Sequence, residues 1–278
     1  MKVSRSTVKR ARGAAGPEEP ERAEAPAKDP LFVTALARGL DVLRCFTPER
    51  EDLGGREIAR LTGLPQPTVW RLCHTLLELG YLVPSDQPNR MRVGSGVLLL
   101  GHAAITRTGL AAFALPRMRQ VCEAHKMSVT LAERHGTDML ILQRVEAPSI
   151  LSLNLHVGSK LDLGNSSLGL AYLCAVDDAT REAALKQLKR RDPPAFAAVQ
   201  RDLQQAMKEY ARWGLVFNLG RSHPDVNAVG VPVISADGRK VMALTSGGAR
   251  SSVTRDRLLD EVGPALQTLA QGLSPMLA

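Results

Sequence analysis

The chain has 278 residues, which exceeds a typical domain of about 150 residues, so we expect two folded units. The formal net charge of +8 is compatible with nucleic-acid binding, although residues 31–93 carry eight arginines against seven acids and are nearly balanced. No apolar run is long enough to cross a bilayer, and none follows the basic N-terminus, so we expect neither a membrane segment nor a signal peptide.

The cysteines and histidines give no pattern of a metal or disulfide site. The six histidines are dispersed, and the wide cysteine spacing excludes a zinc finger and disfavours a disulfide framework. We expect the cysteines to be small buried side chains in a reducing cytoplasm. No cofactor and no metal are expected. The cysteines are Cys45, Cys73, Cys122 and Cys174.

Residues 1–30 differ in composition from the rest of the chain. They begin with basic residues, continue as a run rich in Pro, Glu and Ala, and contain almost no apolar side chains. Such a segment buries too little surface to offset the entropy of ordering it, so we interpret it as a disordered tail. Its basic start is a candidate for nonspecific contact with DNA phosphates, although a solvated tail is the simpler interpretation.

Residues 34–46, with the sequence TALARGLDVLRCF, predict a supporting helix. An apolar stripe at helical spacing should face a core. The stripe consists of Leu36, Leu40, Leu43 and either Val42 or Phe46.

Residues 55–82 predict two short helices around a tight turn. Ile58 and Leu61 share one face of the first helix, and Gly63 ends it, because glycine readily takes the left-handed conformation at a helix C-terminus. The second helix should begin near Pro67, since the first turn of a helix tolerates proline. Its core side should carry Val69, Leu72, Leu76 and Leu79.

The opposite side of the second helix is the candidate DNA-binding face. In a helix-turn-helix the start of this helix enters the major groove, where Arg recognises guanine, Gln recognises adenine and Thr or an aromatic edge contacts a thymine methyl. The expected base readers are Gln66, Thr68, Trp70 and Arg71, with Pro67 on the same side. His74 and Thr75 lie deeper in the helix and suit phosphates.

The next segment completes a winged helix. Gly80 ends the second helix, residues 81–84 and 90–93 predict strands, and residues 85–89 are rich in turn formers. Arg90 and Arg92 are candidates for phosphate or minor-groove contacts, although exposed arginines are as often solubilising surface. We therefore expect a winged helix-turn-helix domain over residues 31–93, with its helix-turn-helix motif at residues 55–74. Without the wing, the helix pair alone would also fit an unrelated domain.

The second half of the chain predicts an α+β domain. A linker helix should occupy residues 94–109, and residues 110–278 should form an antiparallel sheet flanked by helices. Asp237 and Gly238 predict a hairpin turn, and Thr254 should cap the final helix, which carries Leu258, Val262, Leu266 and Leu269. Strands are expected at 128–133, 139–145, 150–156, 215–218, 227–234 and 240–246, and helices at 113–125, 166–175, 180–188 and 196–213.

The second half contains no recognised catalytic motif. It lacks a glycine-rich phosphate loop, a nucleophile elbow and an HExxH arrangement, so we do not expect an enzyme. The run GNSSLG at 164–169 could hold a carboxylate at a helix N-terminus, but a structural cap explains it equally well. Residues 245–248 (TSGG) could offer hydroxyl and backbone N–H donors to a ligand, or they could simply form the end of a strand.

These segments together resemble the isocitrate lyase regulator (IclR) family of bacterial transcription factors. The resemblance covers nearly everything after the tail and rests on the order and spacing of five runs. It implies a winged helix, a linker helix and a GAF-like domain that binds a small molecule, in homodimers or dimers of dimers that act on double-stranded promoter DNA. The runs are ALARGLDVLRCF, GLPQPTVWRL, LELGYL, GSKLDLGNSSLGLAYLCA and NAVGVPVISADGRKVMAL.

The resemblance also implies an effector pocket. In family members that bind small keto acids, an acid stands at the position of Asn218, a cysteine at that of Ala228, and serines at those of Thr245 and Gly247. The substitutions predict a less acidic and roomier pocket with fewer hydroxyls, and therefore a larger, partly apolar organic acid such as an aromatic carboxylate. The implied pocket residues are Leu153, Leu161, Ser167, Leu168, Asn218, Ala228, Thr245 and Gly247.

Two other functions fit parts of the sequence. The first is an enzyme with an appended winged domain, which would need a set of catalytic residues on the sheet. The second is a winged domain used only for protein contacts, which would not bind DNA in a sequence-selective way. The preferred interpretation is a cytoplasmic DNA-binding regulator, controlled by an organic acid, with no membrane partner.

Overall fold

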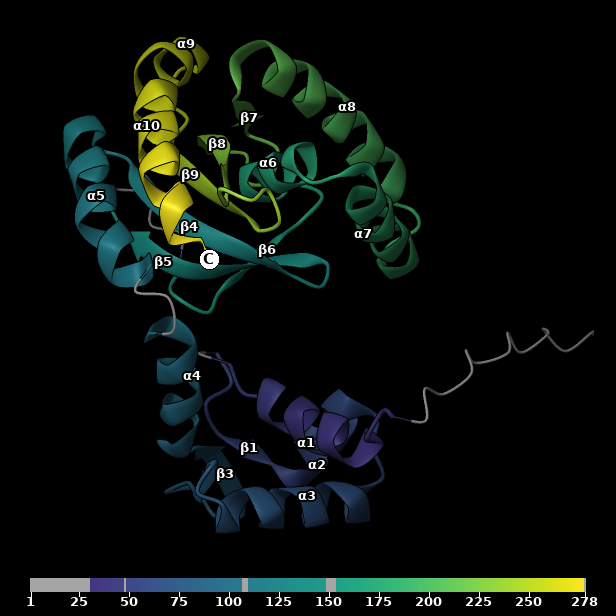
Figure 1. Ribbon diagram of the computed structural model, residues 1–278. Coiled ribbons are helices and arrows are strands. Elements are labelled where there is room, and N and C mark those ends of the chain that lie inside the picture. Colours follow the sequence, from purple (N-terminus) through teal and green to yellow (C-terminus); the bar gives the residue numbers. More distant parts are fainter. Residues whose placement is uncertain (1–30, 48, 107–109, 149–153, 278) are drawn as a thin grey trace, which may run out of the picture. The chain divides into compact units, whose positions relative to one another are not determined.

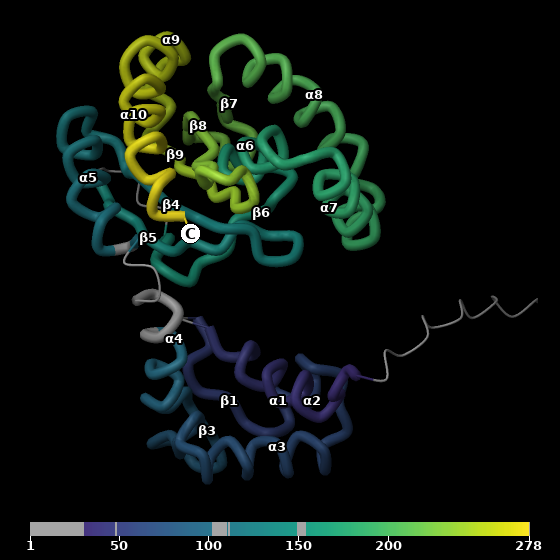
Figure 2. The backbone as a smooth tube through the Cα atoms, in the orientation of Figure 1, coloured from purple at the N-terminus to yellow at the C-terminus, as the bar shows by residue number. Residues whose placement is uncertain are grey.

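The structure is a computed structural model that describes residues 31–47, 49–106, 110–148 and 154–277; the expected tail, residues 1–30, lies outside them. The chain forms two compact units, and the boundary between them along the sequence lies between Val97 and Leu98. The division falls within α4 (Gly96–Thr106), so this helix begins in the first unit and continues in the second. Figures 1 and 2 show the chain path through both units.

The first unit has the winged helix-turn-helix fold that the sequence predicts. Its small antiparallel sheet has the order β1-β3-β2, in which β1 is a short strand that the sequence did not indicate. Figure 1 shows the three helices beside this sheet. The bounds are α1 Thr34–Arg44, β1 Leu53–Gly54, α2 Gly55–Thr62, α3 Gln66–Glu78, β2 Leu82–Pro84 and β3 Arg90–Val93.

The core of the first unit differs in part from the predicted apolar stripes. Leu79 is 61% exposed, so its assignment to the core was wrong. Leu36 and Leu40 of the predicted stripe are 65% and 42% exposed, and Leu61 lies at the unit's surface. The reason is geometric: spacing shows which side chains share a helix face, but not which part of that face another element covers. The buried side chains are Val42, Cys45, Leu53, Ile58, Val69, Cys73, Leu76 and Leu82.

The second unit is built on a six-stranded antiparallel sheet of order β6-β5-β4-β9-β8-β7. Antiparallel pairing places directly opposed residues on the same face of the sheet, which fixes the side chains that meet at the site described below. The bounds are β4 Ser128–His135, β5 Asp138–Val145, β6 Lys160–Asp162, β7 Val216–Leu219, β8 Val226–Ile234 and β9 Val241–Ala249.

Helices cover both faces of this sheet (Figure 1). On one face α5 and α10 enclose a core that includes Met118, Val229 and Leu266, and on the other α6, α7 and α8 enclose a second core around Leu168 and Leu203. The result is the α+β architecture that the sequence predicts. The bounds are α5 Leu110–His125, α6 Ser167–Ala175, α7 Asp178–Arg191, α8 Phe196–Trp213, α9 Arg255–Arg257 and α10 Gly263–Leu273.

Side-chain caps set where several of these helices begin. The hydroxyl of Ser166 accepts a hydrogen bond from Gly169 N at 3.0 Å, and Asp177 accepts one from Thr180 N at 2.7 Å. Thr254 caps the C-terminal helix, as predicted, by accepting from Arg257 N at 3.2 Å. Each cap satisfies a backbone N–H that has no partner within its own helix.

Two features of the second unit differ from the sequence prediction. The strand predicted at 150–156 is not seen in its described part, residues 154–156, and the rest lies outside the described residues; the edge strand is instead β6. The C-terminal helix is interrupted by a π-helical turn at Leu258–Val262. The apolar side chains predicted for that helix are nevertheless buried, because Leu258, Val262 and Leu266 are each 0% exposed.

Candidate functional site

The helix-turn-helix depends on how the chain passes from α2 to α3. Gly63 has φ +68°, the left-handed conformation predicted for the residue that ends α2. Pro65 is the cap of α3, and its carbonyl accepts from Thr68 N at 2.9 Å and Val69 N at 3.1 Å. The helix therefore begins at Gln66, one residue before the predicted start.

The exposed side of α3 carries most of the predicted DNA contacts. Val69 is fully buried, whereas Thr68 is half-buried. The rings of Trp70 and His74 stack in parallel, with centroids 5.5 Å apart, and Trp70 remains 67% exposed. Such a surface offers polar, cationic and aromatic groups to a groove. The exposed members are Gln66, Pro67, Trp70, Arg71, His74 and Thr75.

The two wing arginines have different surroundings. Arg90 is half-buried; its guanidinium donates to the carboxylate of Glu57 at 3.0 Å and also to the carbonyl of Asp52. Glu57 in turn accepts from Gly54 N at 2.8 Å, and this hydrogen bond, followed by those from Arg90, lowers the pKa of Glu57. Arg90 thus joins the wing to α2, and only Arg92, whose side chain is 51% exposed, extends from the wing.

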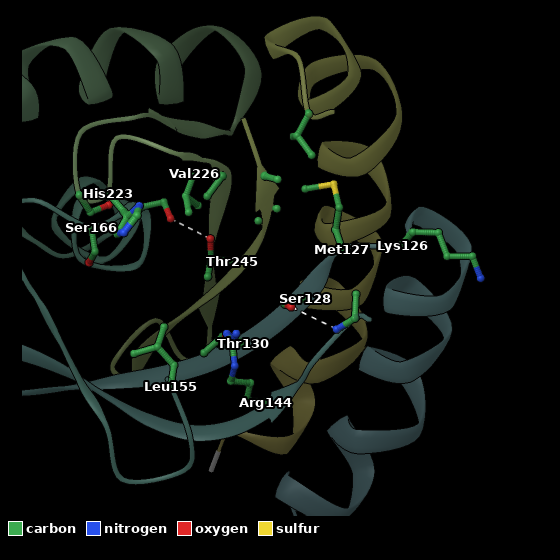
Figure 3. Close-up of a pocket in the computed structure, with 18 of the residues that line it drawn as sticks. Lys126, Met127, Ser128, Thr130, Arg144, Leu155, Ser166, His223, Val226 and Thr245 are labelled. Carbon is green, nitrogen blue, oxygen red and sulfur yellow. Dashed lines mark hydrogen bonds between the residues drawn. The ribbon is translucent and has the colours of Figure 1, made fainter. Parts of the chain in front are cut away.

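The second unit contains a cavity of about 560 Å³. This volume lies within the range of about 300–1,000 Å³ that is usual for small-molecule sites. The cavity opens over the face of β4, β9 and β8 that carries Thr130, Thr245 and Ala228, and Figure 3 shows the side chains around it. Its apolar lining consists of Met127, Ala147, Pro148, Leu155, Leu161, Val226, Ala228, Ala249 and Val253.

The structure brings five of the eight implied pocket residues together around this cavity. Leu168 is not among them, because its side chain is 0% exposed in the second core described above. Leu153 lies outside the described residues. The five are Leu161, Ser167, Ala228, Thr245 and Gly247.

Asn218 holds a neighbouring loop and does not line the cavity, which corrects its assignment. It lies opposite Ala228, but its amide nitrogen donates to Asn165 O at 2.6 Å. Its amide oxygen accepts from Arg221 N at 3.1 Å and Ser222 N at 3.2 Å. The side-chain amide of Asn218 is therefore engaged in bonds to two loops, and these loops present Ser166 and Ser222 to the cavity.

A close approach between backbones fixes the position of α6 over the sheet. A Cβ atom on Gly230 would lie 2.4 Å from Ser167 O, and one on Gly169 would lie 2.0 Å from Leu163 O. Only glycine fits at both places. The resulting contact holds the Ser167 hydroxyl 2.7 Å from Thr245 Oγ1.

Every charged side chain that lines the described cavity is cationic: Lys126, Arg144 and Arg257. Arg257 already donates to His125 O at 2.7 Å and Ser252 O at 3.3 Å, and Lys126 points away from the other labelled side chains in Figure 3. The side chain of Arg144 is 11% exposed and donates to Thr130 Oγ1 at 2.9 Å. No acidic side chain lines the cavity among the described residues.

Several lining residues were missed by the sequence interpretation. Arg144, Thr130 and Ser128 come from two strands, and seven hydroxyl side chains line the cavity, so the pocket is richer in hydroxyls than the substitutions at Ala228 and Gly247 suggested. The alternation along residues 128–133 identifies Ser128 and Thr130 as one face of a strand. It does not reveal which helix covers that face.

The chain matches two family profiles. Residues 35–86 match the IclR helix-turn-helix domain, and residues 102–275 match the bacterial transcriptional regulator IclR C-terminal domain.

The chain belongs to the IclR family.

Individual relatives agree with this membership. An IclR family transcriptional regulator from Brucella abortus, known from a crystal structure, is 35% identical, with a TM-score of 0.79 over 90% of this chain and 95% of that one. The Pca regulon regulatory protein of Pseudomonas putida is 29% identical over 267 residues, 92% of this chain and 88% of that protein.

A third relative shows the fold at lower identity. An IclR homologue from Microbacterium hydrocarbonoxydans, solved in complex with 4-hydroxybenzoate, is 23% identical, with a TM-score of 0.72 over 87% of this chain and 98% of that one. The relatives are transcriptional regulators, and so is this IclR protein, rather than an enzyme. Among its described helices, none is both long and apolar enough to span a membrane.

Proposed function

We propose that this IclR regulator recognises its operator with the exposed side of α3 and that an organic acid in the cavity of the second unit controls this binding. Base contacts are assigned to Gln66, Thr68, Trp70 and Arg71, and phosphate contacts to His74, Thr75 and Arg92. Arg90 is left out of the contact set, because its guanidinium already bonds to Glu57 and Asp52. The protein would act in the cytoplasm.

The cationic lining of the cavity carries the effector proposal. Lys126, Arg144 and Arg257 line it, and no acidic side chain does among the described residues, so an anion would be favoured there and a cation disfavoured. Arg144 and Arg257 are paired with Glu146 and Glu261, which lie outside the lining, each at 3.5 Å. The volume of about 560 Å³ and the apolar lining suit an acid larger than the smallest keto acids. The Microbacterium homologue, which was solved with an aromatic acid, supports the same class.

We infer that the protein acts as a homodimer or a dimer of dimers. Leu98, Leu99 and Leu100 are consecutive on α4 and are 71%, 76% and 55% exposed. Exposed apolar side chains in such a concentration are typical of surfaces that pair with another chain. Two winged domains would then bind two half-sites, and the acid would act by favouring one arrangement of those domains over another.

Calorimetric titration of the full-length protein with a panel of aromatic and aliphatic carboxylates tests the effector class. We expect aromatic acids to bind and glyoxylate to bind weakly or not at all. Tight binding of glyoxylate alone would contradict the proposal. Genomic footprinting of the protein in cells would provide the operator sequence for the DNA measurements below.

A further inference from the structure

Trp70 is a large aromatic side chain on α3 that the first unit leaves mostly uncovered. It is 67% exposed, and it is absent from the side chains that pack against the core of this unit. In a helix-turn-helix domain such as this one, the second helix of the motif is the one that meets the duplex. The apolar surface of the indole is therefore available to a group on the DNA.

The orientation of this ring is set by His74, one helical turn further along α3. The two rings stack in parallel, with centroids 5.5 Å apart and an angle of 5° between their planes. The stack covers one face of the indole, so the exposed area of Trp70 lies mainly on the other face and on the edge. Because the ring is already held in place, little side-chain entropy is lost when a base covers it.

The position of Trp70 along α3 places it in the part of the helix that reaches base edges. It is the fifth residue of a helix that begins at Gln66, and therefore lies about 6 Å from the helix start. The N-terminal residues of a recognition helix contact the bases in the major groove. The base edges there carry hydrogen-bond donors and acceptors and one apolar group, which is the C5 methyl of thymine. That methyl group is the base feature that matches an exposed apolar ring.

Leu79, the cap residue at the C-terminal end of α3, differs from Trp70 in position but not in burial. Its side chain is 61% exposed. It lies nine residues after Trp70, which places it on the opposite side of the helix and about 13 Å further along the axis. A base pair that contacts Trp70 is therefore out of reach of Leu79, and Leu79 provides a matched control.

We propose that Trp70 makes operator binding depend on the C5 methyl group of one thymine in each half-site. The open face or edge of the indole contacts this methyl group, and His74 is the positioning residue that holds the ring. The proposal rests on the operator recognition proposed above and deepens it, because it names the group on the DNA that this side chain reads.

Replacing the thymines of the operator one at a time by deoxyuridine tests the proposal. Deoxyuridine lacks only the C5 methyl and keeps every hydrogen-bonding group of thymine. The methyl ratio is defined here as the dissociation constant of the deoxyuridine operator divided by that of the thymine operator, both measured by fluorescence anisotropy with the full-length protein. At one thymine of a half-site we expect a methyl ratio of about three to five, the effect of uncovering one methyl-sized apolar group.

Variants of Trp70 and Leu79 assign the effect to a side chain. Trp70→Ala should bring the methyl ratio at that thymine close to one, whereas Trp70→Phe, which keeps an aromatic ring but has no indole N–H, should keep a ratio above one. Leu79→Ala should keep the full ratio. All proteins are compared at one salt concentration, low enough for the weakest variant to bind.

Variants of His74 test its positioning role. His74→Ala should lower the methyl ratio, and His74→Phe, whose ring can stack on Trp70, should restore it. Loss of a phosphate contact by His74→Ala weakens binding of the thymine and deoxyuridine operators equally, so it leaves the ratio unchanged. A change in the fraction of folded protein also cancels in the ratio.

The outcomes separate this inference from operator recognition itself. If the protein binds its operator selectively but no deoxyuridine substitution raises the dissociation constant, or if the methyl ratio persists in Trp70→Ala, Trp70 does not read a methyl group. An unchanged ratio in His74→Ala would overturn the positioning role. If the unaltered protein binds its footprinted sequence no more tightly than unrelated DNA, the proposed operator recognition itself fails.

Discussion

Arg71 and Arg90 lie in the same unit but have different surroundings. Arg71 is exposed on α3, and no bond of its guanidinium to a described residue is found, whereas Arg90 bonds to Glu57 and Asp52. We predict that Arg71→Ala weakens operator binding by about 1–3 kcal/mol and relaxes one base preference. Fluorescence anisotropy with an operator fragment at fixed salt measures both effects.

Arg56→Ala is the matched control for Arg71→Ala. Arg56 is an exposed arginine on α2, outside the candidate contact set, and removing it reports the loss of one positive charge alone. Equal losses in the two variants would show that Arg71 contributes charge and not base recognition.

The buried thiol of Cys73 and the partly buried thiol of Cys174 make a second prediction at the residue scale. Burial raises the pKa of Cys73 to about 11 and that of Cys174 to about 12. Because the thiolate is the reactive form, both residues should label slowly with a thiol reagent at pH 8 in the folded protein. Mass spectrometry after labelling checks this, with the urea-unfolded protein as the fast reference. Rapid labelling of either cysteine in the folded protein would contradict the burial described.

The contact between α6 and β8 gives a prediction for an element. A Cβ on Gly230 would lie 2.4 Å from Ser167 O, so Gly230→Ala must displace α6 and should cost about 1–3 kcal/mol of unfolding free energy. Urea unfolding followed by circular dichroism measures this. Gly272→Ala, where the added Cβ meets no atom within 4 Å in α10, should be neutral or slightly stabilising. Equal changes in unfolding free energy for the two substitutions would show that the backbones of Gly230 and Ser167 are not in tight contact.

The junction between the wing and α2 predicts a pH dependence. The pKa of Glu57 is lowered from its ordinary value of 4.5 by the Gly54 N–H and by Arg90, so the unfolded chain binds the proton more tightly than the folded one. The stabilisation is therefore present above pH 4.5 and is lost as the pH falls through the lowered value. Hydrogen exchange of residues 55–62 should show protection falling with acid, and less steeply in Glu57→Gln. Identical slopes in the two proteins would exclude this contribution.

Elements with strong local signals could be predicted from the sequence. The helix Phe196–Trp213 and the strand Arg90–Val93 have the predicted bounds, because apolar spacing and turn residues define them locally. Leu79 and the part of the predicted strand at 154–156 could not be placed correctly in this way. Whether an apolar side chain is covered, or a short run joins a sheet edge, depends on segments far away in the sequence.

The candidate site was predictable only where family positions carry over. Ser167, Thr245 and Gly247 line the cavity as implied, but Asn218 on the same face bonds to a loop instead. Arg144 could not be recognised, because its role depends on the pairing of β5 with β4 and on the bond to Thr130. Such contacts follow from strand register, which local patterns do not specify.

At the scale of the whole molecule, control of DNA binding by an effector requires free-energy coupling between the cavity and α3. An effector changes operator affinity only as far as it binds one arrangement of the protein better than another, and typical couplings are about 1–3 kcal/mol. The coupling is reciprocal, so the operator must change the affinity for the acid by the same factor.

Control of DNA binding by the cavity is measured by the operator dissociation constant, determined by anisotropy at fixed salt with and without a saturating acid. The acid used is the carboxylate that calorimetry finds to bind most tightly. We expect this acid to shift the operator dissociation constant by at least about fivefold, and we expect an operator fragment to shift the dissociation constant of the acid by the same factor. An unchanged operator constant while calorimetry shows the acid bound would contradict control of DNA binding from this cavity.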